Sequence, residues 1–311
     1  MEIILKILRK LYSYLVNNTQ DLEFDFKEQK ASDQINSLLS GNKPFLVARI
    51  GAVEFECISA FLNTSKGVNK YVDYVKGKTN NLEINSNVIQ QAHVNAGIFP
   101  ADKGIVENFA KQALTDIKQI DILGIWLKEK YLLREEIKNF IKIPLKDIEP
   151  YYHLNPWSKA LRGKKVLVIH PFEESIVNQY AKRQMLFENQ NVLPDFELKT
   201  IKAVQTIAGQ SSDFNSWFEA LEYMKGQMDQ IDYDVAIIGC GAYGLSLGAH
   251  AKRSGKQAIH MGGATQILFG IKGSRWDNHP EISELYNEHW SRPLSSETPA
   301  KKDAVEEGCY W

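Results

Sequence analysis

Short apolar runs alternate with longer segments of helical periodicity along most of this chain. The runs that we predict as strands cover residues 44–50, 121–126, 164–170, 196–204, 234–238 and 257–261. The segments that we predict as helices cover residues 32–40, 52–62, 84–96, 103–120, 131–141, 173–188, 214–228 and 242–254. Because strands that alternate with helices pair in parallel, the pattern predicts an α/β fold with a Rossmann-like, doubly wound, mostly parallel sheet flanked by helices.

Changes in composition divide the chain into three parts. We expect an amphipathic helix and a linker in residues 1–30, an α/β domain in residues 31–270, and a polar and aromatic tail in residues 271–311. Residues 144–156 contain three prolines and show little periodicity. A boundary between two halves of the α/β domain is therefore expected near residues 144–160.

The first predicted helix carries an apolar stripe. Its members follow helical spacing and are Ile3, Ile4, Ile7, Leu8, Leu11 and Leu15. Lys6, Arg9 and Lys10 lie away from the stripe, which fits a helix that rests on the anionic inner face of a membrane. Amphipathic first helices are also common in globular folds, so we prefer a helix packed on the body of the protein.

Charge and cysteine content narrow the function classes. The 37 Lys and Arg residues almost balance the 38 Asp and Glu residues, which gives no support for a nucleic-acid partner. The cysteines Cys57, Cys240 and Cys309 are far apart, as in a reducing compartment, and form no metal-ligand cluster. No stretch is apolar and long enough to span a membrane, and we expect a cytoplasmic protein.

A glycine turn follows the predicted strand 234–238. Gly239 allows a sharp turn, Gly241 lets a ligand approach the backbone, and Gly244 lets the next helix pack closely on the sheet. The N–H groups of Tyr243 and Gly244 would face an anion at the helix N-terminus. The alternative is a tight turn that binds no ligand.

The strand after this turn argues against a nicotinamide cofactor. Such enzymes place an Asp or Glu about 20 residues beyond the glycines to hold the ribose. Here the strand ends at His260, followed by Gly262 and Gly263, so no NAD is expected. The two glycines, with Thr265 and Gln266, instead form a second polar turn at the end of a strand.

Three further groups of residues are candidates for binding or chemistry. Arg275 and Trp276 could clamp a base or a sugar, although single aromatic residues often belong to the core. His170 ends a predicted strand and could contact a phosphate or act as acid or base, beside Glu173 and Ser175 at the start of a helix.

The third group is the strand-to-helix turn at Arg49, Gly51 and Glu54. The planar guanidinium of Arg49 suits a diphosphate, and Glu54 could bind a divalent cation or deprotonate a hydroxyl. An ion pair between Arg49 and Glu54 that only fixes the helix is the alternative.

Together these segments resemble the bacterial glycosyltransferases of the GT-D fold over residues 30–270. In that family an early strand leads into Arg-Phe-Gly-Asp-Gly-Glu, whose Asp-x-Glu is associated with a metal and the diphosphate of a sugar nucleotide. Here Arg49, Gly51 and Glu54 match, but Ala52 stands in the position of the Asp. Residues 166–172 and 235–263 resemble the middle strand and the later glycine turn of the family.

The resemblance implies transfer of a sugar, typically UDP-linked, to an acceptor hydroxyl in bacterial surface polysaccharide or glycoprotein biosynthesis. Glu54 and His170 would be catalytic, and either Mg²⁺ or Mn²⁺ at Glu54 or basic and backbone groups would stabilise the leaving diphosphate. The aromatic tail from Trp290 to Trp311 would help form the acceptor side. The alternatives are a non-catalytic protein that binds sugar nucleotides or phosphate, and an NAD-dependent oxidoreductase.

Overall fold

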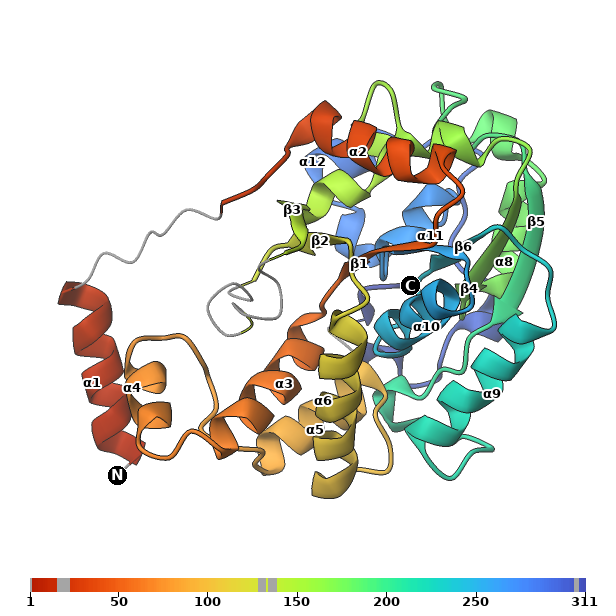
Figure 1. Ribbon diagram of the computed structural model, residues 1–311. Coiled ribbons are helices and arrows are strands. Elements are labelled where there is room, and N and C mark those ends of the chain that lie inside the picture. The colour runs from red at the N-terminus through yellow and green to blue at the C-terminus, as the bar shows by residue number, and fades with distance from the viewer. Residues whose placement is uncertain (1, 16–22, 128–132, 134–138, 305–307) are drawn as a thin grey trace.

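The protein forms one seven-stranded parallel sheet covered by helices on both faces. The computed structural model describes residues 2–15, 23–127, 133, 139–304 and 308–311. The strand order is β3-β2-β1-β7-β6-β4-β5, and every neighbouring pair is parallel. The strands are β1 (Phe45–Arg49), β2 (Ile122–Ile125), β3 (Ile141–Pro144), β4 (Lys165–His170), β5 (Glu197–Lys202), β6 (Val235–Ile238) and β7 (Gln257–His260). This confirms the expected α/β, Rossmann-like fold (Figure 1).

Alternate residues of each strand bury opposite faces of the sheet. On β6, Ala236 and Ile238 pack into one apolar cluster, whereas Val235 and Ile237 pack into the other. The first cluster is completed by α3 (Ala52–Thr64), α5 (Ser86–Ala96), α6 (Lys103–Ile117), α9 (Trp217–Asp229) and α10 (Tyr243–Arg253). The second is completed by α2 (Glu28–Ser40), α8 (Glu173–Tyr180), α11 (Ala264–Leu268) and α12 (Pro280–Ser283). The inner strands β1, β2 and β6 are almost entirely apolar because both of their faces are covered, whereas the edge strands β3 and β5 contain polar and partly exposed residues.

One strand was missed in the sequence. Residues 141–144 form β3, which pairs with β2 in the register Ile122 to Ile141, rather than ending a helix. Ile141 and Ile143 alternate with Lys142, which is the two-residue period of a strand. The segment is so short that its hydrophobic pattern does not distinguish a strand from the end of a helix. The rest of the helix predicted over residues 131–141 lies almost entirely outside the described part of the chain.

The helix predicted over residues 173–188 is also shorter than expected. It ends at Tyr180, and a short 3₁₀ turn over Arg183–Met185 follows. The Tyr180 hydroxyl donates to the carbonyl of Phe196 at 2.8 Å, which ties the end of α8 to the start of β5.

The chain reverses direction across the sheet between β4 and β6. From β4 the chain continues outward to β5, whereas from β6 it continues inward to β7. Ligands of doubly wound sheets bind outside the carboxyl ends of the strands at such a reversal. Residues 145–161, where a boundary was expected, form short 3₁₀ helices. β1 precedes this segment in the chain and β7 follows it, and because these two strands pair, the strands on both sides of the segment belong to one sheet.

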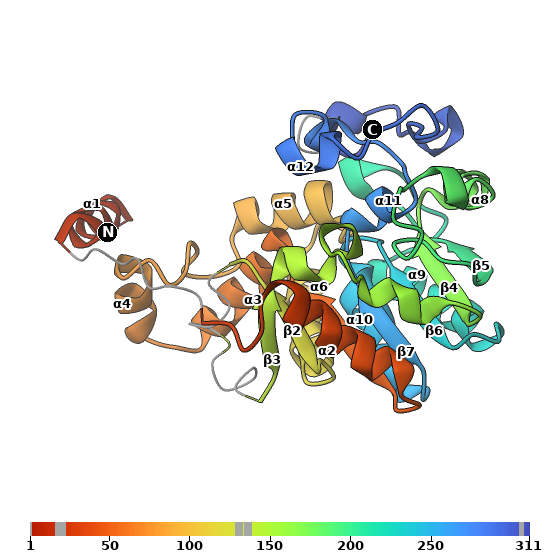
Figure 2. The same cartoon turned by 90° about the horizontal axis from the view of Figure 1, so that it is seen from above.

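The N-terminal helix α1 (Glu2–Leu15) lies at the periphery of the molecule, beside α4 (Asn69–Val75) (Figures 1 and 2). It packs through Leu5 and Arg9, whereas we expected its apolar stripe to be the packing face. The stripe is exposed because it lies on the opposite side of the helix. Within the described residues, no helix has the length and apolarity needed to cross a bilayer.

Candidate functional site

A cavity of about 540 Å³ lies at the carboxyl edge of the sheet, where small-molecule sites of this fold class occur. The turns after β1, β4, β6 and β7 form its walls, together with residues 204–207 and Tyr310 of the C-terminal tail. It brings together most of the residues singled out in the sequence. These are Arg49, Gly51, Glu54, His170, Gly239, Gly241, Tyr243, Gly262, Gly263, Gln266, Arg275 and Trp276.

Arg49 ends β1 and spans one wall of the cavity. Its guanidinium lies 4.9 Å from the centre of the Trp126 ring, a cation–π contact. A β-carbon at Gly262 would lie 2.9 Å from Nη1 of Arg49, and Gly262 has a φ of 63°, so only glycine suits this position. Among the described residues, the buried Nε of Arg49 has no hydrogen-bond partner. Arg49 therefore lines the cavity with an incompletely satisfied guanidinium, the group whose planar fork matches the paired oxygens of a diphosphate.

Glu54 lies in the first turn of α3, with its carboxyl group folded over Gly51. A β-carbon at Gly51 would lie 2.1 Å from Oε2 of Glu54, so the glycine makes room for this side chain. Ala52, which stands in the position of the family's Asp, lines the cavity beside it. A single carboxylate is therefore present at this turn.

A second carboxylate, Glu149, lines the same cavity and was missed in the sequence. The Tyr151 hydroxyl donates a hydrogen bond to Oε2 of Glu149. Burial raises the pKa of Glu149 to about 7, while the Tyr151 hydrogen bond and the charge of Arg49 act in the opposite direction. Glu149 belongs to the proline-rich stretch that was interpreted as a boundary. Identifying residues 141–144 as a strand would have placed the following residues near the ligand-binding edge.

His170 is buried and neutral at the end of β4. Its Nδ1 accepts a hydrogen bond from the backbone N–H of Phe172 at 3.0 Å, so Nε2 carries the proton. Burial lowers the pKa of His170 to about 3. At neutral pH the His170 ring is therefore uncharged, and its Nε2–H group is a hydrogen-bond donor.

His260 is also buried at the edge of the cavity. Burial, followed by the charge of Arg49, lowers its pKa to about 4. Its Nδ1 lies 3.2 Å from the carbonyl oxygen of Ile238, so the neutral ring donates to the backbone of β6. The position where a nicotinamide enzyme places an acid thus holds an uncharged side chain.

Four of the candidate residues do not line the cavity. Ser175 donates to Glu297 of the C-terminal tail, whose Oε1 also accepts from the backbone N–H of Glu174 at 2.8 Å. This carboxylate neutralises the N-terminus of α8, where an anionic ligand was envisaged. Glu173 accepts a hydrogen bond from Thr200 at 2.7 Å.

The other two residues, Thr265 and Gly244, shape the turns behind the cavity. A β-carbon at Gly239 would lie 2.6 Å from Cβ of Thr265, so this glycine lets the turns after β6 and β7 touch. A β-carbon at Gly244 would lie 2.0 Å from Cε1 of His260. Gly241 has a φ of 57° and open space around it, so the backbone is accessible there.

Replacing Gly244 with alanine is expected to destabilise the protein. The buried ring of His260 is held by the backbone of β6, so the added methyl group should lower the free energy of unfolding by about 2 kcal/mol or more. Gly226 in α9 is the matched control, because a β-carbon there meets nothing within 4 Å. Gly226→Ala should raise the free energy by about 0.5–1 kcal/mol. Urea unfolding of both variants measures the contrast, and equal effects would contradict it.

The C-terminal tail closes one wall of the cavity. A β-carbon at Gly263 would lie 2.5 Å from Cε1 of Tyr310, whose ring centre lies 4.9 Å from the guanidinium of Arg275. Gln266 Nε2 donates to the carbonyl of Tyr310 at 3.1 Å, and within the described residues its buried Oε1 has no hydrogen-bond partner. Trp290 and Trp311, by contrast, are buried in the core.

The donor set does not fit a metal held by the protein alone. In the described part of the chain, no three His, Cys, Asp or Glu side chains are grouped as metal ligands require. The positive charge of Arg49 acts on Glu149 in the same cavity, which opposes a second cation there.

Comparison of the chain with protein-family models, with curated proteins and with solved structures gave no match.

Proposed function

We propose that the cavity binds a nucleotide sugar and transfers its sugar to an acceptor hydroxyl. The observation that carries this proposal is the presence of Arg49, Glu54 and Glu149 on one cavity at the carboxyl edge of a parallel sheet. The volume of about 540 Å³ falls in the range of small-molecule sites. The resemblance of Arg49, Gly51 and Glu54 to the GT-D glycosyltransferases supports the same reaction.

In this proposal the donor diphosphate contacts Arg49 and the glycine turn after β6. The planar guanidinium forms paired hydrogen bonds to the phosphate oxygens, and backbone N–H groups at the start of α10 add further donors. Trp276 and Tyr310 supply aromatic faces on which a base or sugar can stack. The neutral imidazole of His170 donates a hydrogen bond to the bound donor through its Nε2–H group.

Glu149 is the proton acceptor in this proposal. The acceptor hydroxyl attacks the anomeric carbon, its proton passes to Glu149, and the bond from that carbon to the diphosphate breaks. The electron pair leaves with the diphosphate, whose charge Arg49 stabilises. A carboxyl group with a pKa near 7 is well suited to this proton transfer at neutral pH. Glu54, our candidate from the sequence, is the alternative base.

The nucleotide is identified by a thermal-shift panel with UDP, GDP, CMP and NAD. UDP is expected to raise the melting temperature by about 3 °C at roughly 100 times its Kd. Hydrolysis of UDP-sugars, with and without EDTA, then tests for turnover, and Glu149→Gln and Glu54→Gln compare the two carboxylates.

Each other outcome points to a different function. If NAD stabilised the protein and UDP, GDP and CMP did not, the proposal would be overturned in favour of an oxidoreductase. Binding of UDP without turnover, across a broad set of acceptors, would indicate a non-catalytic binding protein. Ala52 is the position that favours this second function, because it removes one carboxylate of the family's pair.

A further inference from the structure

Helix α1 presents an apolar surface to solvent. The exposed residues lie on one side of the helix, and each is between 45% and 84% exposed. They are Ile3, Ile4, Ile7, Leu8, Leu11, Tyr14 and Leu15. Within the described residues nothing covers this stripe, and α1 itself lies at the periphery of the molecule, beside α4 (Figures 1 and 2). Exposed apolar surface of this extent on a single helix is typical of an interaction site.

The opposite side of α1 is attached to the body of the protein. Arg9 donates to the carbonyl of Thr79 at 2.9 Å and to Oδ1 of Asn80 at 2.7 Å. Its guanidinium also lies 4.9 Å from the centre of the Tyr74 ring, and Leu5 is buried beside α4. These contacts hold the helix in an orientation that turns its stripe outward.

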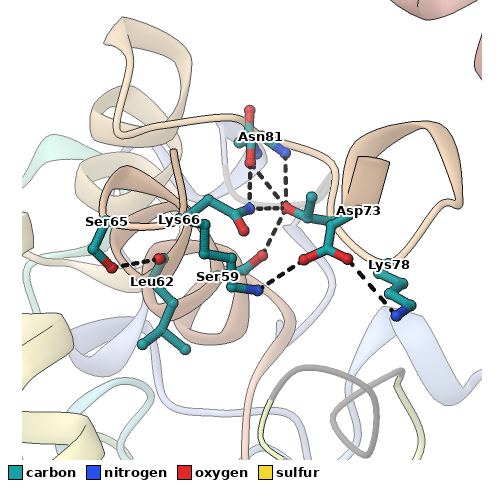
Figure 3. Close-up of polar contacts among 9 residues, drawn as sticks. Ser59, Leu62, Ser65, Lys66, Asp73, Lys78 and Asn81 are labelled. Atoms are coloured by element: carbon teal, nitrogen blue, oxygen red, sulfur yellow. Dashed lines mark hydrogen bonds and ion pairs between the residues drawn. The ribbon is translucent and has the colours of Figure 1, made fainter. Parts of the chain in front are cut away.

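The loop that receives Arg9 is itself firmly attached to α3. Asn63 donates to Oγ1 of Thr79 at 2.7 Å and to the carbonyl of Asn81 at 2.8 Å, while Ser59 lies 2.8 Å from the same Thr79 oxygen (Figure 3). Asp73 of α4 pairs with Lys66 at 3.0 Å, and Lys78 lies 3.7 Å from its other oxygen. The polar network therefore connects α1, through this loop, to the helix that begins at the cavity.

This lobe of the protein is strongly basic. Residues 2–15 and 66–78 contain seven Lys and Arg residues and two acidic residues, Glu2 and Asp73, although the net charge of the whole chain is -1. Lys6 and Lys10 are exposed beside the stripe, and Val68 at the start of α4 and Val72 within it are also exposed. Two copies of this surface would repel each other, whereas an anionic surface would attract it.

We infer that α1 lies in the surface of an anionic lipid bilayer, with its apolar stripe among the acyl chains and its lysines at the headgroups. A helix of 14 residues is too short to span a bilayer but suits an orientation parallel to the surface. Apolar burial and attraction to anionic headgroups act together in such binding. The inference is independent of the proposed sugar transfer.

Flotation of the full chain with lipid vesicles tests this inference. The protein should bind vesicles of phosphatidylcholine that contain about 30% phosphatidylglycerol, and bind pure phosphatidylcholine more weakly. The double variant Ile7→Glu, Leu11→Glu should reduce the partition coefficient at least about tenfold. Raising the salt concentration from about 0.1 M to about 0.5 M should also weaken binding.

Leu154→Glu is the matched control, because Leu154 is 84% exposed, as Leu15 is. It should leave vesicle binding unchanged, and circular dichroism should show that all variants are folded. Equal binding by the parent protein and the double variant would overturn the inference, as would the absence of binding to anionic vesicles. Sedimentation velocity supplies one more contrary result, a dimer that the double variant dissociates, because the stripe would then be covered by a second copy. Measuring UDP-sugar hydrolysis in the absence of vesicles tests the function of the cavity independently of membrane binding.

Discussion

Replacing Glu149 with glutamine is expected to abolish sugar transfer and to make the protein more stable at alkaline pH. The loss of activity follows from removing the proton acceptor, and we expect a decrease in kcat of about 100-fold or more. The gain in stability follows from burial, which raises the pKa of Glu149 to about 7 from an ordinary value of 4.5. A carboxyl group with a raised pKa stabilises the fold below its ordinary pKa, and this contribution is lost as the pH rises through 7.

Urea unfolding at two pH values measures the stability effect. Glu149→Gln should exceed the parent protein by about 1–3 kcal/mol at pH 8 and by much less at pH 5. An equal difference at both pH values would contradict the assigned cause. Retention of full kcat would contradict the role of Glu149 in proton transfer.

Tyr151→Phe gives a more specific test of the same carboxyl group. The Tyr151 hydroxyl lowers the pKa of Glu149, so its removal should raise that pKa further. The rate of transfer needs the deprotonated carboxylate, and its fall on the acid side should therefore begin at a higher pH than in the parent protein. A change that only loosened the structure would lower the rate without moving the pH profile.

Replacing Arg49 with methionine is expected to remove most of the affinity for the donor diphosphate. Methionine keeps part of the apolar stem against Trp126 but lacks the guanidinium. We expect kcat/KM to fall by about 100-fold or more, because one charged donor to the leaving group is lost. Calorimetric titration should show a weakened affinity for UDP and an unchanged affinity for uridine, which has no phosphate. Equal loss of both affinities would contradict the assignment.

Arg49→Lys separates the charge of this residue from its shape. Lysine keeps a positive charge near Glu149, so the pH profile should stay near that of the parent protein. In Arg49→Met the pH profile should move to higher pH, because the charge that lowers the pKa of Glu149 is absent. Both variants should bind UDP more weakly, since neither has the planar fork that matches two phosphate oxygens. A lysine variant with full affinity would show that the charge alone is sufficient.

The sheet and its helices were largely predictable because strong local patterns encode them. Strands that are covered on both faces are continuous apolar runs, and the helices between them repeat every three or four residues. β3 departed from this rule because it is a short strand at the edge of the sheet, where Ile141 and Ile143 alternate with polar residues. Such a segment is equally compatible with the end of a helix when only the sequence is considered.

The strand ends that carry glycines, Arg49, Glu54 and His170 could also be identified from the order of amino acids alone, because these residues follow recognisable apolar runs. Which of them share a cavity depends on the order of the strands in the sheet, and so it became apparent only in the folded chain. Folding placed Glu149 beside Arg49 and seated Glu297 on the N-terminus of α8, where Ser175 had been expected to face a ligand. It also turned the stripe of α1 outward. These outcomes depend on contacts between residues about 70 to 120 positions apart, which no local pattern encodes.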